Sequence, residues 1–475
     1  MRPGAGAIVV FLAAAAVLML EILAARMLAP YVGVSLNTYT GIIGVVLAGI
    51  AAGTWIFGRL ADSVDPRRLL GPLLIAGGLL AMASGPLVKL LGEHVRSDSL
   101  KAIVALSGAT FFLPAFVLSG VTPVVVKQQL ESLAATGRTV GRLSGAGTFG
   151  ALVGTFGTGF FLTSRVHTHT IVLVIGIALV CLGALVAWRV DPRASVPVLG
   201  LVVALSLGAG VASSRVKGPC DTESAYFCIR VLGDAHERLL QLDNIPHSSV
   251  DLDDPSRLGF PYALAVAGVI DVLHPPPQPV RALHVGGGAF TMPLYLAATR
   301  PGSSSTVFEL DQAVVDTARD RFGVRTGPLL RVKVGDARLS VAKAPSASFD
   351  IVIGDAFASR SVPWHLTTRE FLRDVHRLLR PGGAYAMNLI DAGSDFARAE
   401  AATMRTVFGS VSIVQVFHNF VLVGSDRPLD PSELKRRLQA HNVPGLPLTG
   451  AAVDRFIGGA QVLTDDFAPV DQLLT

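Results

Sequence analysis

The sequence predicts a two-part fold: an all-α membrane domain over residues 1–215, followed by an α/β domain with a doubly wound parallel sheet. Apolar residues make up 51% of the 475 positions and charged residues only 16%, which is too hydrophobic for an ordinary soluble protein. Long apolar runs fill the first half, whereas strand-like and helix-like segments alternate in the second. We place a small β-hairpin domain over 216–274 and the α/β domain over 275–475, after the boundary marked by Pro275-Pro276-Pro277.

Seven apolar runs are long enough to cross a bilayer as helices. They are Ala7–Leu28, Thr38–Leu60, Leu69–Leu91, Ala102–Val126, Gly145–Thr163, Thr170–Trp188 and Val196–Ala212. Glu21 and Arg26 interrupt the first run, so we interpret it as a retained helix and not as a cleaved signal peptide. Ala146, Gly150 and Gly154 form a small-residue stripe that favours close helix packing. The expected partner of this half is therefore the lipid bilayer.

The charges differ between the halves. Up to Arg215 there are 15 Lys and Arg against 7 Asp and Glu, which gives 15 − 7 = +8. Beyond it there are 25 against 28, which gives 25 − 28 = −3. The positive first half fits membrane topology, and the negative second half argues against a nucleic-acid partner.

Strands and helices alternate beyond the last apolar run. We predict two short strands at Tyr226–Val231 and Arg238–Leu242, joined by a turn. Further predicted strands are 282–285, 306–310, 330–334, 349–354, 384–389, 412–417 and 420–423, with helices at 292–299, 312–322 and 370–379. This alternation favours a parallel sheet that binds its ligand at the carboxyl ends of the strands.

A glycine triplet and an acidic residue form the strongest motif. Gly286, Gly287 and Gly288 follow the apolar strand 282–285, and Glu309 lies about 20 positions further on. Glycines have no Cβ, so the backbone can approach a ligand closely, and the acidic side chain can accept hydrogen bonds from ribose hydroxyls. The motif predicts an adenosyl-binding turn.

Three acidic residues follow successive strands and should converge on one crevice. They are Glu309, Asp336 in the stretch Gly335-Asp336-Ala337-Arg338, and Asp355 after the fourth strand. We expect Asp336, with Ala337, to meet the adenine, and Asp355 to act on the group beyond the cofactor's sulfur. The alternative for each is a helix N-cap or turn residue.

Residues 220–475 resemble the spermidine synthase (polyamine aminopropyltransferase) family, within the class I methyltransferase fold. The resemblance rests on Glu223-Ser224-Ala225-Tyr226, Leu240-Gln241-Leu242-Asp243, the glycine loop and the three acidic residues, and Pro381-Gly382-Gly383 is common to the wider methyltransferase class. The layout with helices in front resembles the membrane-anchored bacterial members. The ending Thr464-Asp465-Asp466-Phe467-Ala468-Pro469-Val470 also resembles theirs, and we expect a surface turn there.

The resemblance implies a transferase that takes S-adenosylmethionine or its decarboxylated form as co-substrate. Glu309 would bind the ribose, Asp336 the adenine, and Asp355 would accept the proton of an attacking amine. It further implies Tyr226, His247 and Tyr262 as substrate residues. The expected partners are an amine or another small nucleophile, with a homodimer as a further option.

Several departures from the family pattern leave three functions open. Ala289 and Phe290 stand where the family has Asp-Gly, and Ala356-Phe357-Ala358-Ser359 replaces a second carboxylate-bearing stretch. Cationic substrates would lose counter-charges there. Our leading hypothesis is aminopropyl transfer to an amine with Asp355 as base. The alternatives are methyl transfer from S-adenosylmethionine, and a non-catalytic transporter-like or sensory membrane protein that binds a nucleoside or polyamine.

The number of apolar runs that cross the bilayer determines on which side of the membrane the C-terminal domain lies. Arg59, Arg67, Arg68, Lys127, Arg138, Arg142, Arg189 and Arg193 mark one set of loops, against Arg96, Lys101 and Arg165 in the other. The positive-inside rule places the richer set and the N-terminus in the cytoplasm. Seven crossings put the residues after Val216 outside. Since the cytoplasm supplies adenosyl cofactors, we expect that the run 145–163 or 196–212 does not cross, and that the C-terminal domain is cytoplasmic.

Two cysteines bear on the same question. Cys220 and Cys228 follow the last apolar run and could form an external disulfide, but we expect two free thiols on a cytoplasmic β-hairpin. Neither their spacing nor the neighbouring residue types support a zinc site, so no metal is expected.

Overall fold

The computed structural model describes residues 2–474, apart from 191–218 and positions 96, 98, 131, 133, 134, 164, 359, 445 and 446. The chain divides into two compact units, Met1–Cys228 and Ile229–Thr475. Each unit has its own buried apolar core, so each is described by itself.

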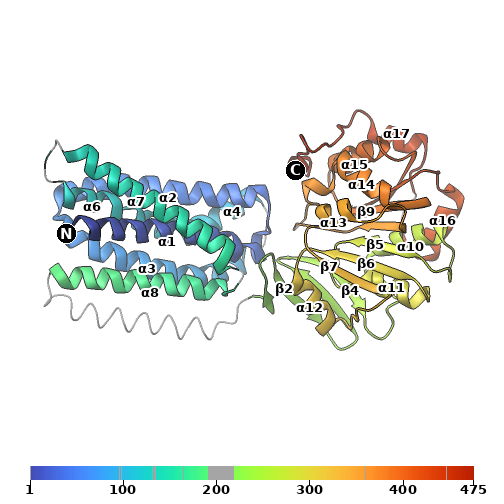
Figure 1. Cartoon of the computed structure of the whole chain (residues 1–475), viewed down its shortest axis with the longest axis horizontal. Helices are drawn as coiled ribbons and strands as arrows, with labels where there is room; N and C mark the ends of the chain where they lie inside the picture. The colour runs from blue at the N-terminus through green and yellow to red at the C-terminus, as the bar shows by residue number, and fades with distance from the viewer. Residues whose placement is uncertain are drawn as a thin grey trace. The chain divides into compact units, whose positions relative to one another are not determined.

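The first unit is a bundle of long apolar helices, which lie side by side in Figure 1. They are α1 (Pro3–Val32), α2 (Leu36–Ser63), α3 (Pro66–Gly92), α4 (Leu100–Ser107), α5 (Leu113–Ser119), α6 (Val121–Gln129), α7 (Thr136–Phe156) and α8 (Thr168–Val190). A π-helical stretch, η1 (Gly108–Phe112), joins α4 to α5, and another, η3 (Gly157–Leu162), extends α7.

Six of these stretches are long and apolar enough to span a membrane, with 100–129 counted as one and 136–162 as another. They match the first six predicted runs, and the Gly-rich run 145–163 is covered except for Thr163. The seventh predicted run, Val196–Ala212, lies outside the described residues.

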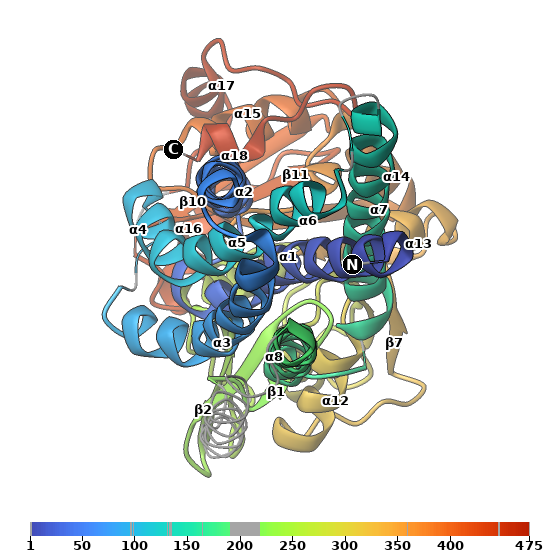
Figure 2. The same ribbon diagram turned by 90° about the vertical axis from the view of Figure 1, so that its left-hand side faces the viewer.

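Small residues let the helices of the bundle approach one another closely. Figure 2 shows the bundle from its end. A Cβ on Gly154 of α7 would lie 2.6 Å from the carbonyl oxygen of Ala15 in α1, and one on Gly150 would clash with the carbonyl oxygen of Phe11. Backbones this close are typical of small-residue packing between membrane helices. The predicted stripe therefore serves helix packing.

Arg26, near the end of α1, binds the segment that follows the bundle. Its guanidinium donates to the carbonyl oxygen of Ala225 at 2.8 Å and to Glu223 Oε1 at 3.2 Å. The backbone N–H of Thr168, the first residue of α8, donates to Glu223 Oε2 at 3.3 Å. Glu223, in the short strand β1 (Thr222–Glu223), thus lies where α1 ends and α8 begins, at the end of the bundle opposite to Val190.

Cys220 and Cys228 form a disulfide within the first unit. Our expectation of two free thiols was therefore wrong. The eight-residue separation of the two cysteines lets the chain turn back through β1, which brings their side chains together. Cys181 in α8 is a free, exposed cysteine.

The second unit begins with an antiparallel meander of β2 (Cys228–Gly233), β3 (Glu237–Leu242) and β4 (Ile245–Asp251). Two of these strands match the predicted pair, whereas β4 was not predicted. The meander leads into α10 (Pro261–Leu273), which was not predicted either. Pro261 occupies the first turn of this helix, where its missing N–H costs nothing.

A seven-stranded sheet forms the centre of the second unit. Its strands are β5 (Arg281–Val285), β6 (Ser304–Glu309), β7 (Leu330–Val334), β8 (Phe349–Gly354), β9 (Leu379–Ile390), β10 (Ser410–Val416) and β11 (Asn419–Ser425), in the order β10-β11-β9-β8-β5-β6-β7. The strands from β7 to β9 are parallel, and β11 pairs antiparallel with both β9 and β10. The chain order reverses beside β5, which makes the sheet doubly wound and class I methyltransferase-like, as predicted.

Helices cover both faces of this sheet (Figure 1). They include α11 (Thr291–Thr299), α12 (Gln312–Arg321), α13 (Ala337–Lys343), α14 (Arg369–Leu378), α15 (Asp395–Arg405), α16 (Pro431–Ala440), α17 (Ala451–Ile457) and α18 (Val470–Leu473), with a short 3-10 helix, η4 (Trp364–Leu366). One core packs α13, α14 and α15 on the sheet and another packs α10, α11 and α16.

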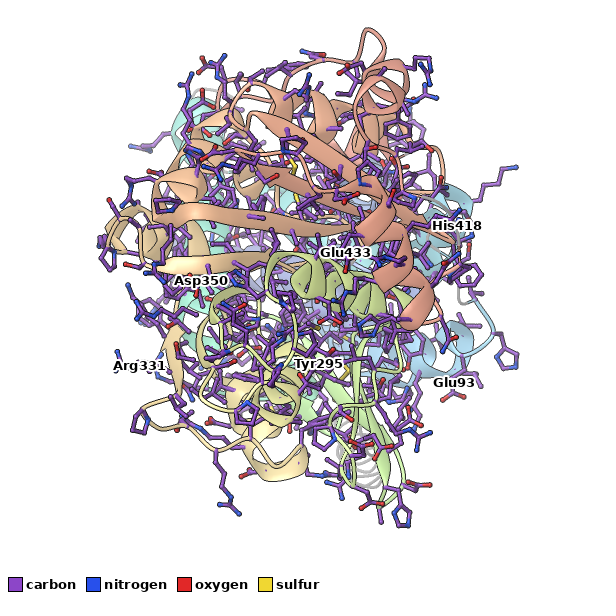
Figure 3. All side chains as sticks on the ribbon, turned by 90° about the vertical axis from the view of Figure 1, so that its right-hand side faces the viewer. Glu93, Tyr295, Arg331, Asp350, His418 and Glu433 are labelled. Atoms are coloured by element: carbon purple, nitrogen blue, oxygen red, sulfur yellow. A yellow bond between two sulfur atoms is a disulfide. The ribbon has the colours of Figure 1, made fainter. Side chains whose placement is uncertain are left out.

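Asp350, labelled in Figure 3, anchors the amino end of the sheet. Its carboxylate accepts the backbone N–H of Arg281 at 2.9 Å and the guanidinium of Arg380 at 2.9 Å. Since it joins β5, β8 and β9 at their amino ends, the opposite, carboxyl ends are where a ligand site is expected.

Candidate active site

The glycine loop follows β5 and packs against the residue after β8. Gly286 has φ 99° and Gly288 φ 51°, and a Cβ on Gly286 would clash with the carbonyl oxygen of Asp355. The backbone N–H of Gly286 donates to the carbonyl oxygen of Phe308 at 2.9 Å. Glycine is therefore required at position 286 both by conformation and by the approach of the neighbouring strand.

Glu309 at the end of β6 holds this loop. Its side chain is buried, Oε2 accepts the N–H of Gly287 at 2.7 Å, and Oε1 accepts the N–H of Asp311 at 3.0 Å. Burial raises the pKa of Glu309, and backbone hydrogen bonds from Asp311, Gly287 and Gly288 partly oppose that shift. The two carboxylate oxygens have four lone pairs between them, so the backbone donors leave acceptor capacity for a ligand hydroxyl.

Asp336 caps α13, and Ala337 is the first residue of that helix. Asp336 Oδ1 accepts the N–H of Leu339 at 3.1 Å, and Oδ2 lies 3.4 Å from His365 Nε2. Asp336 is therefore a helix N-cap, which was the alternative expected from the sequence. Its side chain is 37% exposed, so Oδ2 can still meet a ligand, and its adenine role stays a prediction.

The meander covers the glycine loop through two contacts that the sequence did not predict. Ser248 Oγ accepts the N–H of Ala289 at 2.8 Å, and the hydroxyl of Thr291 donates to the carbonyl oxygen of Ser249 at 2.8 Å. Ala289 and Phe290 are fully buried. Position 289, where the resemblance implied a carboxylate in other family members, is thus apolar and enclosed.

Asp355, directly after β8, is bound by two uncharged donors. The hydroxyl of Tyr262 donates to Oδ2 at 2.8 Å, and the side-chain amide of Asn388 donates to Oδ1 at 2.9 Å. Burial raises the pKa of Asp355, whereas the bonds from Asn388 and Tyr262 lower it. Asn388 Oδ1 in turn accepts the amide of Asn419 at 2.9 Å, which fixes the orientation of Asn388.

His247 lies beside the same carboxylate network. The hydroxyl of Tyr262 is 3.4 Å from the carbonyl oxygen of His247, whose ring meets Phe357 edge-on at 6.2 Å between centroids. Burial lowers the pKa of His247 to about 4, so the ring is neutral near pH 7. Among the described residues its buried Nε2 has no hydrogen-bond partner, which leaves it for a ligand.

The structure brings together most of the predicted site residues. Gly286, Gly287, Gly288, Glu309, Asp336, Ala337 and Asp355 all follow the carboxyl ends of parallel strands, and His247 and Tyr262 lie at the Asp355 network. Tyr226 belongs to the first unit, where its side chain is exposed and its ring lies 6.4 Å from that of Phe227.

Asn388, Asn419 and Ser248 were missed by sequence reasoning. A polar Asn388 inside the apolar strand 384–389 was the one signal that could have identified the first. No sequence signal marked Asn419 or Ser248, because strand pairing and the packing of the meander bring them to the site.

These residues fit an adenosyl group. A loop that tolerates no Cβ at Gly286, a buried Glu309 with unused lone pairs and a partly exposed Asp336 follow three neighbouring strands. Ribose and adenine offer the hydroxyl and amino donors that such acceptors need. The described residues contain no group of three or more His, Cys, Asp or Glu that could hold a metal.

Comparisons with known proteins agree with this geometry. A family described as "Methyltransferase domain" matches residues 283–387. The polyamine aminopropyltransferase of Vibrio vulnificus is 29% identical over 244 residues, which are 47% of this chain and 79% of that protein. The chain contains a spermidine synthase-like domain with the class I methyltransferase fold.

Two further comparisons concern this spermidine synthase-like domain. The eEF1A lysine and N-terminal methyltransferase of Danio rerio is 27% identical over 157 residues, 31% of this chain and 23% of that protein. The crystal structure of a probable spermidine synthase from Corynebacterium glutamicum is 31% identical and covers 52% of this chain and 95% of its own, with a TM-score of 0.47. The domain is aminopropyltransferase-like, and its named relatives are transferases.

Proposed function

We propose that the spermidine synthase-like domain transfers an aminopropyl group from decarboxylated S-adenosylmethionine to an amine, with Asp355 as the base. The observation that carries this proposal is the environment of Asp355. Its carboxylate lies beside the glycine loop and is bound by Tyr262 and Asn388, two uncharged donors. Since neither donor is a cation, no fixed positive charge neutralises the ionised carboxylate, which can accept a proton or bind an ammonium group.

The bound adenosyl sulfonium supplies an electrophilic carbon. The amine nitrogen bonds to that carbon, the carbon–sulfur bond breaks, and its electron pair leaves with sulfur as a neutral thioether. The nitrogen becomes positively charged in this step and releases a proton. Asp355 takes up a proton from the amine, either before attack from the ammonium form or from the product, so that atoms and charge balance.

Tyr262 and Asn388 give this base a fixed direction. Each binds a different oxygen of Asp355, so the carboxylate cannot rotate freely, and burial removes competing water. Burial raises the pKa of Tyr262 well above 10, so its phenol remains a donor throughout the neutral range. The neutral ring of His247 adds a hydrogen-bonding atom for the substrate without adding a repelling positive charge.

Methyl transfer from S-adenosylmethionine is the second candidate. It is favoured by the buried, apolar Ala289 and Phe290, because no carboxylate at position 289 meets the ammonium of an aminopropyl group. The methyltransferase family match and the Danio rerio relative agree with it. Binding without transfer is a third outcome that the same experiment detects.

We propose further that the chain spans the membrane and that the C-terminal domain lies on the non-cytoplasmic face. Glu223 is at the end of the bundle opposite to that of Lys127, which pairs with Asp62 at 2.6 Å among the basic loops. The positive-inside rule assigns those loops to the cytoplasm. The Cys220–Cys228 disulfide also favours an oxidising compartment. The second unit follows Cys228 directly, and among its described residues the one apolar helix of 10–17 residues is α10.

The non-cytoplasmic location differs from the cytoplasmic one that we expected because the cytoplasm supplies adenosyl cofactors. It requires the adenosyl co-substrate to be present on the non-cytoplasmic face. Orientation and chemistry are separate proposals, because transfer by the purified chain does not depend on the side of the membrane.

The test of function uses the full chain purified in detergent. Thermal stabilisation is measured with decarboxylated S-adenosylmethionine, S-adenosylmethionine and methylthioadenosine, and products with an amine panel are identified by mass. We expect the largest stabilisation from the decarboxylated form and a product heavier than the amine by one aminopropyl group. A product heavier by one methyl group would establish methyl transfer instead. No stabilisation by any of the three would contradict both enzymatic functions.

A further inference from the structure

Asp465, near the C-terminus, joins two segments that follow separate strands of the sheet. Its Oδ2 accepts the guanidinium of Arg338 at 2.7 Å, and its Oδ1 accepts the hydroxyl of Thr368 at 2.6 Å. Arg338 is the second residue of α13, directly after Asp336 and Ala337, and Thr368 is the N-cap of α14. Both oxygens of one carboxylate are therefore used to join α13 to the start of α14.

Arg338 extends this connection to His365. Its guanidinium also donates to the carbonyl oxygen of His365 at 2.7 Å and to the hydroxyl of Thr368 at 2.9 Å. The His365 ring lies 3.4 Å from Asp336 Oδ2. Arg338, which binds Asp465, thus also holds the backbone of the histidine whose ring lies beside the predicted adenine-binding carboxylate.

The segment carrying Asp465 is itself anchored by its backbone. The N–H of Asp465 donates to Glu370 Oε2 at 3.0 Å, and the carbonyl oxygen of Leu463 accepts the N–H of Arg369 at 2.9 Å. The N–H of Leu463 donates to the hydroxyl of Thr403 at 2.9 Å. Leu463 is fully buried, so the carboxylate is presented from a fixed strip of chain and not from a free tail.

The charge of Asp465 is suited to this position. Burial alone would raise its pKa, but the bonds from Thr368 and Arg338 outweigh burial and lower the pKa of Asp465. The Arg338 side chain is only 20% exposed, and charge-assisted bonds to a carboxylate are stronger than bonds between neutral groups. Replacing the carboxylate with an amide would leave the Arg338 charge without its counter-charge.

We propose that Asp465 is a positioning residue that completes the adenosyl-binding site, by fixing Arg338, Asp336 and the turn 363–368. This inference rests on the proposed function, because it assigns Asp336 and His365 to the adenine end of that site. It gives the terminal Thr464-Asp465-Asp466 stretch a purpose beyond that of a surface turn. Residues that hold a ligand-binding side chain in place affect affinity without touching the ligand.

Asp466 provides a matched control. It is the same residue type at the next position, is exposed, and makes no side-chain hydrogen bond or ion pair among the described residues. Asp465→Asn should disturb the connection, Asp466→Asn should not, and Asp465→Glu should restore part of it, since the carboxylate is retained on a longer side chain.

The experiment measures binding of methylthioadenosine to the full chain in detergent by calorimetry, together with hydrogen exchange of peptides covering 363–368. We expect Asp465→Asn to weaken binding about tenfold or more and to speed exchange in 363–368, with Asp466→Asn unchanged and Asp465→Glu intermediate. Exchange in the bundle helices should be unaffected, which separates local release from unfolding.

The outcomes separate this inference from the proposed function. If the wild-type chain binds methylthioadenosine and Asp465→Asn binds it equally well, the positioning role is wrong and the proposed function stands. Equal losses in Asp465→Asn and Asp466→Asn would also overturn it, because they would reflect a general charge effect. If the wild type binds no adenosyl ligand, both fail. If Asp465→Asn does not fold, Arg338→Lys tests the same connection, and unchanged affinity there would contradict the inference.

Discussion

The hydroxyl of Tyr262 donates a 2.8 Å hydrogen bond to Asp355 Oδ2, across 93 residues of sequence. Tyr262 comes from the helix after the meander and Asp355 from the carboxyl end of β8, so this bond joins the two parts of the candidate site. Asp355, the proposed base, is therefore held in place by a neighbouring side chain and is not only an acidic residue at the end of a strand. Its orientation and its proton affinity both depend on an uncharged neighbour.

Removing that neighbour should change the pH dependence of the reaction. Tyr262→Phe deletes a donor that lowers the pKa of Asp355, so the pKa should rise further above its ordinary value. A base must be ionised, and the acidic limb of the rate profile should therefore move to higher pH, with about a tenfold loss or less at its plateau. The pH profile of the transfer rate measures this, with Tyr295→Phe as a control from α11.

Glu400 should make the protein less stable as the pH rises. Its side chain lies in α15 with no exposed surface, and neither carboxylate oxygen has a partner among the described residues. Burial raises the pKa of Glu400 well above 4.5. The folded state keeps this proton while the unfolded state loses it, so stability is full below the unfolded pKa and declines as pH rises through the folded pKa.

Glu400→Leu should therefore stabilise the chain by about 1–3 kcal/mol at pH 8 and by less at pH 5. Melting temperatures between pH 5 and pH 8 provide the measurement. The exposed Asp395 on the same helix offers a control, and Asp395→Asn should change stability by less than about 0.5 kcal/mol. A wild-type melting temperature that is independent of pH would contradict this assignment.

The Arg26–Glu223 pair should contribute more to the bundle than the Lys127–Asp62 pair. Side chains of the first pair are 19% and 20% exposed, against 47% and 68% for the second. Arg26→Gln leaves Glu223 partly buried without a cation and should cost about 1–2 kcal/mol, whereas Lys127→Gln should cost less than about 1 kcal/mol. Helix melting in detergent, followed by circular dichroism, compares them. Equal losses of stability in the two variants would mean that the ion pair of Arg26 with Glu223 does not stabilise the bundle.

The Cys220–Cys228 disulfide predicts the outcome of thiol labelling in intact cells. An impermeant thiol reagent should modify these cysteines only after reduction, and Cys181→Ser removes the remaining thiol from the signal. Labelling without prior reduction would mean that the disulfide does not form. Labelling only after cell lysis would place the segment, and the domain that follows it, in the cytoplasm.

The sheet could be predicted from the sequence because its signals are local. Apolar strands such as 282–285 and 349–354 are short, are bounded by turn residues and alternate with helical segments, so each could be recognised alone. The glycine loop and the acids after successive strands came from the same reasoning, since parallel strands bring their carboxyl ends together. The short helix α13 was missed because its seven residues show no clear periodicity.

The orientation of the site residues could not be predicted in this way. Nothing local shows that Asn419 directs Asn388 toward Asp355, or that Ser248 binds the glycine loop, because these contacts depend on strand pairing and on how the meander packs. Glu309 was expected at the ribose, but its bond to Gly287 appears only once the loop has folded. The disulfide was likewise open, since cysteine spacing alone does not reveal pairing.

The most direct test of the account compares Asp355→Asn with the wild type, using decarboxylated S-adenosylmethionine and an amine that the wild type accepts. Asn keeps the shape of the side chain but cannot accept the proton. We predict a loss of about a thousandfold in the transfer rate, with methylthioadenosine binding changed by less than about threefold. Transfer that continues in Asp355→Asn at the wild-type rate would contradict the account, because the base would then be another group.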